Sequence, residues 1–197
     1  MNIVQLIIKR VIDFLFAFFF LIILFPFFCI IALLIKLDSS GPVFFLQERI
    51  GKNQKRFKVF KFRTMVENAI NIGTGIHTGK GDPRITRIGS FLRSTSIDEL
   101  PQLINILIGE MSLIGPRPAI DLHLNQYNDD DYIRFKMKPG ITGLAQINGR
   151  SKIPVKTRLI FDKEYVNNYS LLLDLSIFLK SFVVVLSGKD LYHREIK

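Results

Sequence analysis

The chain contains little of what proteins use to build disulfides or thiolate metal sites. Its 197 residues include one cysteine, Cys29, no tryptophan and three histidines, His77, His123 and His193. A single cysteine excludes an intramolecular disulfide framework and a zinc site built from cysteines. The histidines are far apart in sequence and show no ligand spacing. A metal ion held by carboxylate and phosphate oxygens stays open.

Acidic residues are scarce as well. Asp plus Glu number 17 against 27 Lys plus Arg, which gives a formal charge of +10. Hydrophobic residues make up 48% of the chain and charged residues 22%, so the composition excludes a disordered or low-complexity protein. The length is that of about one domain with its own core.

Charge is absent from one long stretch near the N-terminus. Residues 14–35 are 22 consecutive residues without a charged side chain. As a helix rising about 1.5 Å per residue they would extend roughly 33 Å, close to the thickness of a bilayer core. The sequence therefore predicts a membrane helix. A signal peptide is disfavoured because its apolar core has about 7–15 residues and ends at a small-residue cleavage site, which is missing here.

Two features argue against a straight membrane span. Pro26 removes one backbone hydrogen bond and clashes with the preceding turn, so it kinks or breaks the helix. Lys9 and Arg10 precede the apolar run, and Lys36 and further bases follow it, so positive charge favours the cytoplasmic side at both ends. A helix–break–helix that enters and leaves through one leaflet satisfies both flanks. A kinked span is the alternative, because prolines are tolerated in membrane helices.

Beyond a turn cluster at residues 38–42, the sequence predicts a β-hairpin. Residues 43–50 and 57–63 are rich in β-formers, and Gly51-Lys52-Asn53-Gln54 between them has the composition of a turn. The bases of the second strand either form a solvated face or contact phosphates or lipid headgroups. The glycines of residues 73–81 predict a loop near the site, and this loop lacks the Gly-Lys-Ser/Thr ending of a P-loop.

Two adjacent carboxylates, Asp98 and Glu99, precede an apolar pattern with helical spacing. One interpretation is structural, because Ser96 and Glu99 match a capping box, or Asp98 caps the helix with Pro101 in its first turn. The other interpretation is catalytic. A helix N-terminus and the nearby Arg93 keep a carboxylate ionised, and an ionised aspartate can attack phosphorus or bind Mg2+.

Three turns later in the chain carry basic residues or glycines. Gly115-Pro116-Arg117-Pro118 holds Arg117 on a stiff segment, which suits either a bidentate phosphate contact or a surface connector. Pro139-Gly140-Ile141-Thr142-Gly143 fits a type II turn. Asn148-Gly149-Arg150 is a turn that ends in a base. Each of these alone has little weight.

Taken in order, these motifs resemble those of the bacterial sugar transferase family, the small monotopic polyprenyl-phosphate phosphoglycosyl transferases. The resemblance covers the chain from about Lys9 to Leu186. It is carried by Lys9-Arg10-x-x-Asp13, the proline-interrupted apolar run, Lys61-Phe62-Arg63-Thr64-Met65, Arg93-Ser94-Thr95-Ser96-Ile97-Asp98-Glu99-Leu100-Pro101-Gln102, and the three turns above. One departure is Phe25, because many relatives place a small polar residue before the proline, and Phe25 has no hydroxyl to steady a kink.

The resemblance implies transfer of a phospho-sugar from a UDP-sugar to undecaprenyl phosphate with release of UMP, through a covalent aspartyl phospho-sugar. It implies that Asp98 is the nucleophile and that Glu99 and Asp98 are ligands of Mg2+. Phosphate binding is implied for four basic residues, with less weight on the last two: Arg93, Arg117, Arg150 and Lys61. The excess of positive charge agrees with two anionic substrates.

The expected architecture is α+β and mostly helical. Residues 1–37 form a re-entrant membrane helix that breaks at Pro26, and residues 38–197 form a cytoplasmic helical catalytic domain with a small β-hairpin and interfacial helices. The apolar stretch 171–186 contains Asp174 and Lys180, which favours an interfacial or core-packed helix over a span. The expected location is the bacterial inner membrane, with the active site on the cytoplasmic face.

Two other function classes compete with this one. A membrane-tethered binding protein would hold anionic lipid with its bases and would need neither Asp98 nor Glu99. A polytopic phospho-sugar transferase would need several long apolar spans, and the sequence has one. Nucleic acid is not an expected partner, because the bases form no recognised reader motif. Recognition of the sugar is expected in residues 73–81 and 121–131, and no motif identifies which sugar that is.

Overall fold

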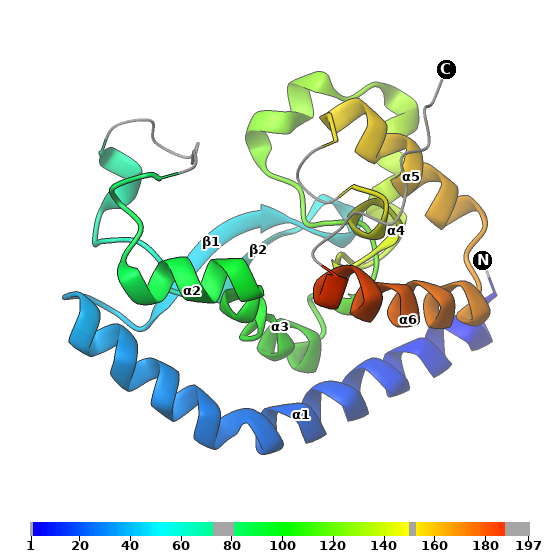
Figure 1. Cartoon of the computed structure of the whole chain (residues 1–197). Coiled ribbons are helices and arrows are strands. Elements are labelled where there is room, and N and C mark those ends of the chain that lie inside the picture. The colour runs from blue at the N-terminus through cyan, green and yellow to red at the C-terminus, as the bar shows by residue number, and fades with distance from the viewer. Residues whose placement is uncertain (1, 73–80, 150–152, 188–197) are drawn as a thin grey trace.

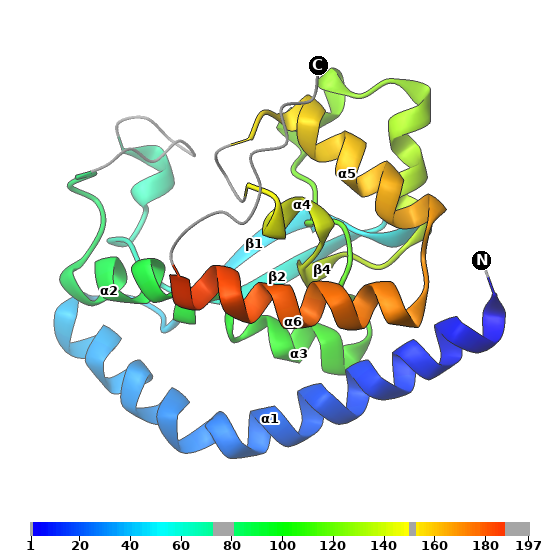
Figure 2. The ribbon, with the colours of Figure 1, turned by 45° about the vertical axis from the view of Figure 1, so that its right-hand side comes forward.

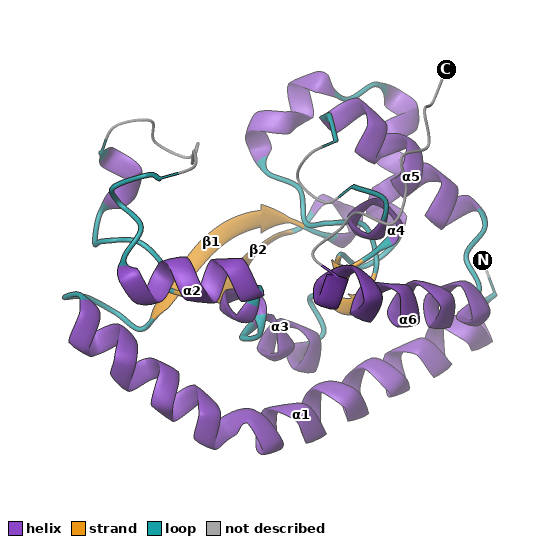
Figure 3. Ribbon diagram, in the orientation of Figure 1, coloured by secondary structure: helices purple, strands orange, loops and turns teal. Residues whose placement is uncertain are grey.

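The computed structural model describes residues 2–72, 81–149 and 153–187 of the chain. Figure 1 shows a long bent helix lying along one side of a mostly helical body. The helices and strands of the described residues, in chain order, are α1 (Ile3–Asp38), β1 (Phe44–Ile50), β2 (Arg56–Phe62), α2 (Arg87–Thr95), α3 (Gln102–Ile108), β3 (Ser112–Ile114), β4 (Gly140–Thr142), α4 (Leu144–Ile147), α5 (Val155–Asn167) and α6 (Leu171–Ser187). The predicted class, mostly helical with a small β-hairpin, is confirmed (Figure 3).

Helix α1 is continuous through Pro26, so the prediction of two short helices separated by a break is wrong in this respect. A proline removes one N–H donor and displaces one carbonyl, and a long helix can absorb that loss by bending. Figures 1 and 2 show α1 as bent rather than straight. The helix ends where Ser39 takes an extended conformation.

The N-terminal half of α1 is attached to the body by polar side chains. Lys9 Nζ lies 2.6 Å from Asp174 Oδ2 of α6, and both residues are buried. Asp13 Oδ1 accepts a hydrogen bond of 2.9 Å from the backbone N–H of Leu113. Arg10 donates to two carbonyls in the last turn of α3, at 2.6 and 2.9 Å. These contacts explain the predicted Lys-Arg-x-x-Asp motif, because its three charged residues face the body.

The C-terminal end of α1 is attached to the same body. Asp38 Oδ2 accepts a 2.9 Å hydrogen bond from the backbone N–H of Ile88, in the first turn of α2. Arg63, which is buried, donates to the carbonyl of Ser39 at 2.7 Å. Both ends of the apolar helix are therefore held by one folded unit.

The middle of α1 is apolar and exposed. Among the described residues, α1 is the one helix that is long and apolar enough to cross a membrane. Large hydrophobic side chains that α1 leaves more than half exposed include Phe19, Ile22, Ile23, Phe25, Ile30 and Leu33. Water does not favour such a surface, so it marks a contact with lipid or protein.

The predicted β-hairpin is confirmed. Strands β1 and β2 pair antiparallel from Phe44 opposite Phe62 to Ile50 opposite Arg56. The alternation of β2 buries Phe57 and Val59 and leaves Lys58 exposed, so part of its basic face is solvated as one interpretation expected. Buried Asn105 of α3 accepts from the N–H of Phe60 at 3.0 Å, which attaches the hairpin to α3.

The predicted type II turn at Pro139-Gly140 is wrong. Gly140 begins β4, which pairs parallel with β3, and it is absent from the glycines with positive φ. A glycine is needed here because two backbone segments of the chain approach each other closely. A Cβ on Gly140 would lie 2.1 Å from the backbone nitrogen of Gly115. The sequence pattern correctly marked this position as one that needs glycine. The reason is the short distance between neighbouring backbone segments, not a turn.

Helix α6 is packed on one face and exposed on the other. Ile177 and Val184 are buried in a core that they share with Tyr165 of α5. Leu172, Leu175, Leu179 and Phe182 are more than half exposed on the opposite face. Figure 2 shows α6 running alongside α1. The prediction for this segment is confirmed as a core-packed helix, and its outer apolar stripe agrees with an interfacial position.

Candidate active site

The two adjacent carboxylates lie in the connection between α2 and α3. Ser96 has a left-handed conformation (φ 59°), residues 97–99 form one 3-10 turn, and α3 begins after Pro101. Neither Ser96 nor Pro101 makes a side-chain capping hydrogen bond. The structure therefore contradicts both capping interpretations, because Ser96 makes no capping bond and the N-cap of α3 is Pro101 rather than Asp98. Asp98 and Glu99 are left available for other contacts.

Glu99 holds two cations. Its Oε1 accepts from Lys61 Nζ at 2.7 Å and from Arg117 Nη2 at 2.8 Å. Burial alone would raise the pKa of Glu99, but Arg117 and Lys61 outweigh it and hold the pKa well below its usual range. Glu99 is thus a permanently charged group that fixes a lysine of β2 and an arginine of the Gly-Pro-Arg-Pro segment beside the second carboxylate.

Asp98 has the opposite surroundings. Among the described residues it makes no hydrogen bond or ion pair with another side chain, and it is partly buried. Burial, followed by the charge of Glu99, raises the pKa of Asp98 to about 6, against the opposing effects of Lys61 and Arg93. The sequence predicted surroundings that keep this carboxylate ionised, whereas the structure raises its pKa. At pH 7 it is still about nine-tenths ionised and more basic than an ordinary aspartate, which suits a nucleophile.

Five of the six predicted catalytic and phosphate-binding residues line one cavity of about 690 Å³. These are Lys61, Arg93, Asp98, Glu99 and Arg117. They come from β2, the last turn of α2, the connection to α3 and the segment after β3. The sixth residue, Arg150, lies outside the described residues. The structure thus gathers side chains that are up to 56 positions apart in sequence around a single space.

The opposite wall of this cavity is apolar. Phe16, Phe20 and Leu24 of α1 contribute to it, as do Phe178 and Phe182 of α6. The rings of Phe16 and Phe178 contact each other edge to face, with centroids 5.8 Å apart. One cavity is therefore lined both by charged side chains, including a carboxylate, and by apolar side chains of α1.

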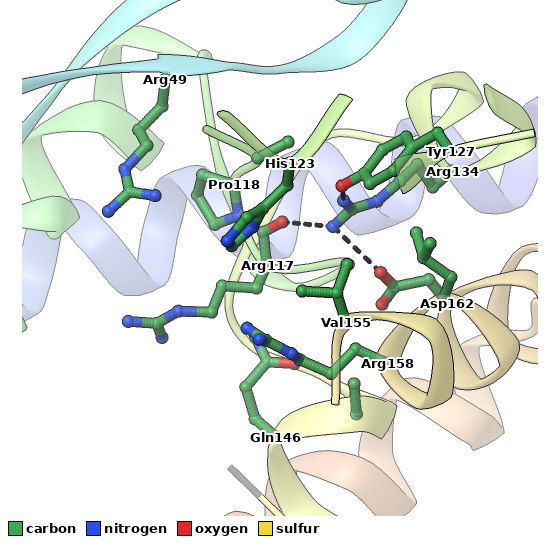
Figure 4. A pocket seen from close by; sticks show the side chains of 13 residues that line it. Arg49, Arg117, Pro118, His123, Tyr127, Arg134, Gln146, Val155, Arg158 and Asp162 are labelled. Atoms are coloured by element: carbon green, nitrogen blue, oxygen red, sulfur yellow. Dashed lines mark hydrogen bonds and ion pairs between the residues drawn. The ribbon is translucent and has the colours of Figure 1, made fainter. Parts of the chain in front are cut away.

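The sequence did not single out three polar residues at the border of this cavity. Arg49 of β1, Gln146 of α4 and Arg158 of α5 line a smaller cavity of about 50 Å³, together with Arg117 (Figure 4). Burial and Arg117 lower the pKa of Arg49 to about 10, and the same two causes lower that of Arg158. No local motif includes Arg49 or Arg158. Gln146 could have been found, since it lies between two of the quoted turns.

The carboxylates of the site bear on whether a metal ion could bind. Among the described residues no group of three or more His, Cys, Asp or Glu side chains could hold one. Asp98 and Glu99 are the available pair in the larger cavity. Mg2+ prefers one or two carboxylates, several waters and substrate phosphates, so this pair fits Mg2+ bound together with a phosphorylated substrate. It does not fit a metal that needs a complete protein cage.

The chemistry of the site follows from these contacts. The carboxylate of Asp98, which makes no hydrogen bond or ion pair with another described side chain, lines a cavity together with Lys61, Arg93 and Arg117. Guanidinium groups bind phosphate oxygens in bidentate fashion and stabilise charge that develops on them. The arrangement suits attack of Asp98 on a phosphorus atom, beside an apolar wall that can hold a lipid chain.

Comparison with known proteins finds similarity over most of the chain. The family model described as bacterial sugar transferase matches residues 4–188. The exopolysaccharide production protein PSS of Rhizobium leguminosarum is 44% identical over 184 residues, which cover 88% of this chain and 92% of the relative. The exopolysaccharide production protein ExoY of Sinorhizobium fredii is 40% identical over 198 residues, with 93% and 88% covered.

A longer relative carries the name of an activity. The UDP-glucose:undecaprenyl-phosphate glucose-1-phosphate transferase of Escherichia coli is 43% identical over 195 residues, covering 94% of this chain but 41% of the relative. The chain therefore spans nearly the whole length of the two exopolysaccharide proteins and about two fifths of the Escherichia coli enzyme.

Proposed function

The chain belongs to the bacterial sugar transferase family, and from that premise we propose that it transfers a sugar 1-phosphate from a UDP-sugar to undecaprenyl phosphate and releases UMP. The transfer initiates the assembly of a membrane-bound glycan. The names of relatives that act on UDP-glucose, galactose and undecaprenyl phosphate support it. The observation that carries it is the larger cavity, where the carboxylate of Asp98 lies between three cationic side chains and an apolar wall.

The proposed reaction has two displacements at one phosphorus atom. In the first, Asp98 Oδ attacks the β-phosphorus of the UDP-sugar, the bond from that phosphorus to the bridging oxygen breaks, and UMP leaves with the bridging oxygen. The product is an aspartyl phospho-sugar. In the second, a phosphate oxygen of undecaprenyl phosphate attacks the same phosphorus and Asp98 is released as a carboxylate. Both steps keep the phosphoryl group in one place. This agrees with a single cavity that is lined by the charged side chains and by the apolar ones.

Glu99 positions the cations in this scheme. Lys61 and Arg117 are each within 2.8 Å of its Oε1, so the two positive groups stay next to the reacting phosphate. Arg117 in turn has guanidinium nitrogens left for phosphate oxygens, and Arg93 lines the same space. When bound, Mg2+ held by Asp98 and Glu99 would supply neutralisation of the diphosphate charge. Arg150 stays a prediction for phosphate binding.

The proposed location is the bacterial inner membrane with the site at the cytoplasmic face. Support comes from α1, whose two ends are attached to the same body by Asp13 and Asp38 while its apolar middle is exposed. A helix held in this way enters and leaves through one leaflet. It would keep the apolar cavity wall at the depth of the lipid acceptor and leave residues 38–197 in the cytoplasm as the catalytic domain.

Release of UMP tests the proposed reaction. Purified protein in nanodiscs would be mixed with Mg2+, a panel of UDP-sugars, and undecaprenyl phosphate where indicated. We expect one UDP-sugar to yield UMP continuously with the acceptor and about one equivalent without it. Asp98→Asn should lower release by about 10³-fold or more, because it removes the nucleophile. The matched control is Glu164→Gln, which changes an exposed carboxylate of α5 that lines neither cavity. Absence of UMP with every sugar would favour the lipid-binding class instead.

Cysteine labelling tests the proposed membrane arrangement. In a Cys29→Ser background, Asn2→Cys and Ser40→Cys place one thiol at each exposed end of α1, and Lys58→Cys marks the body. A membrane-impermeant maleimide should label all three in inverted membrane vesicles and none in right-side-out spheroplasts. Labelling of the first two from opposite sides would show a kinked span.

A further inference from the structure

The smaller cavity continues the larger one away from its apolar wall. Arg117, Gln146 and Arg158 line both cavities, so the two spaces share a border. The larger cavity reaches α1 and α6, whereas the smaller one is formed by β1, the segment from Pro118 to Arg134, α4 and α5. Figure 1 shows α5 on the side of the body away from α1. A ligand in the smaller cavity therefore lies beyond the reacting group, away from the lipid helix.

The positive charge of this cavity is incompletely balanced. Arg134 is paired with Asp162 at 2.9 Å, so one cation is neutralised. Arg49 and Arg158 have no ion pair with a carboxylate among the described residues, and Arg117 lies between them (Figure 4). Burial and repulsion from Arg117 both act against keeping Arg49 and Arg158 charged, and the pKa of each of these two groups is lowered. Like charges gathered in a cleft point to an anionic ligand.

Gln146 adds unpaired hydrogen-bonding groups. Its side-chain oxygen and nitrogen each expose less than 1 Å² and find no partner in the described part of the chain, and the same is true of Arg158 Nε. Burying such groups without a hydrogen bond costs about 1–3 kcal/mol each. The chain retains them at the border of two cavities, where a ligand can satisfy them.

We propose that Arg49, Arg117, Arg158 and Gln146 form the subsite for the nucleotide of the donor, in which the arginines bind the phosphate of the UMP leaving group and the Gln146 amide pairs with the imide edge of uracil. The proposal rests on the proposed function. A primary amide offers one donor and one acceptor, which complement the N–H and the carbonyl oxygen of that edge. The position away from α1 suits the water-soluble end of the donor, while the lipid acceptor approaches along the apolar wall. Arg117 then contacts the group that leaves and also Glu99.

Equilibrium binding of UMP and ribose 5-phosphate to the full chain in nanodiscs tests the subsite without turnover. Isothermal titration at one fixed salt concentration is required, because phosphate contacts depend on ionic strength. Arg49→Gln and Arg158→Gln should each weaken both ligands about tenfold, since each removes a charge-assisted hydrogen bond. Gln146→Met, which keeps the side-chain length, should weaken UMP about fivefold or more and leave ribose 5-phosphate unchanged. The control Arg87→Gln removes one exposed positive charge elsewhere and should change neither.

The outcomes separate this inference from the proposed function. Affinities within twofold of the parent chain for both arginine variants would overturn the phosphate assignment, provided circular dichroism shows the folded helix content. Arg49→Lys and Arg158→Lys, which keep the charge, replace any glutamine variant that does not fold. Equal losses for both ligands in Gln146→Met would overturn the base assignment. UMP release by the parent chain together with unaffected variant binding would overturn the subsite alone. UMP binding without turnover of any UDP-sugar would overturn the reaction and leave the subsite standing.

Discussion

Buried polar groups have opposite surroundings in two regions of this molecule. Where the N-terminal half of α1 meets the body, the buried charged side chains have partners, because Lys9 lies 2.6 Å from Asp174 and Asp13 accepts from a backbone N–H at 2.9 Å. In the two adjoining cavities, Asp98 makes no hydrogen bond or ion pair with another side chain, and the amide of Gln146 has no partner, among the described residues. Both regions contain charge out of water, and they differ in whether the protein itself satisfies it.

The difference separates structural polar groups from those available to a ligand. Folded proteins satisfy nearly all buried polar atoms, so a cluster of unsatisfied ones indicates that something else binds there. Glu99 shows that location alone does not decide the matter. It lies in the larger cavity but is bonded to Lys61 and Arg117, so it belongs with the structural groups and acts by holding cations in place.

Removing one partner of the α1 attachment should have the largest effect on stability. Asp174→Ala leaves the ammonium of Lys9 buried without a counter-charge and removes the acceptor of the 2.7 Å hydrogen bond from Tyr165. We expect a loss of about 3–5 kcal/mol in the free energy of unfolding, measured by chemical denaturation followed by far-UV circular dichroism in detergent. The matched control Asp130→Ala, at an exposed aspartate, should change it by less than about 0.5 kcal/mol.

A double substitution sharpens the same test. Lys9→Met with Asp174→Leu removes both charges and keeps the volume, so it should recover most of the loss, because a well-packed apolar pair often equals a buried ion pair. If Asp174→Ala unfolds at the same denaturant concentration as the control, the ion pair does not hold α1. The statement that the polar groups at this attachment are structural would then be wrong.

Much of the site was predictable because its motifs are local. Asp98 and Glu99 are adjacent, and Arg93 lies one helical turn earlier on α2, so their proximity needs no knowledge of the fold. The alternating pattern of residues 57–63 likewise predicted the hairpin, although not that Lys61 alone among its lysines would reach Glu99. That choice depends on which face of β2 is turned inward, because Lys61 shares a face with buried Phe57 and Val59 whereas Lys58, which is exposed, lies on the other face.

The remaining residues meet only through tertiary structure. Arg49 and Arg158 belong to β1 and α5 and share no spacing that a sequence pattern could reveal, and Gln146 of α4 lies between two motifs without belonging to either. Local sequence patterns also gave wrong predictions at two positions where the backbone conformation differs from the one that the pattern usually indicates. The capping box was not formed because Ser96 is left-handed, and Gly140 is a strand residue whose missing side chain lets β4 approach β3.

The smallest expected effect is a gain in stability from a substitution that abolishes activity. Burial and the charge of Glu99 raise the pKa of Asp98 from 3.8 to about 6, so the folded state binds this proton more tightly than the unfolded state does. The ionised carboxylate therefore destabilises the fold, and this penalty appears as the pH rises from about 4 and is complete above about 6. Asp98→Asn removes the penalty and should increase the free energy of unfolding by about 1–2 kcal/mol at pH 8, after allowance for partial exposure.

The sign of the pH dependence makes this prediction specific. Denaturation of the parent chain and of Asp98→Asn at pH 8 and pH 5 should give a larger difference at pH 8, because the parent aspartate is mostly protonated at pH 5 and then resembles asparagine. A control at Glu99 should move in the other direction, because Glu99→Gln replaces the carboxylate shared by Lys61 and Arg117 with a neutral amide and leaves both cations without their counter-charge. Stabilisation by Asp98→Asn and destabilisation by Glu99→Gln would show that two neighbouring carboxylates of one site differ in function. Glu99 would be satisfied by the protein, and Asp98 would be available to a ligand. Destabilisation by both would instead show that Asp98 is also held by the protein, and that it is not poised for a substrate.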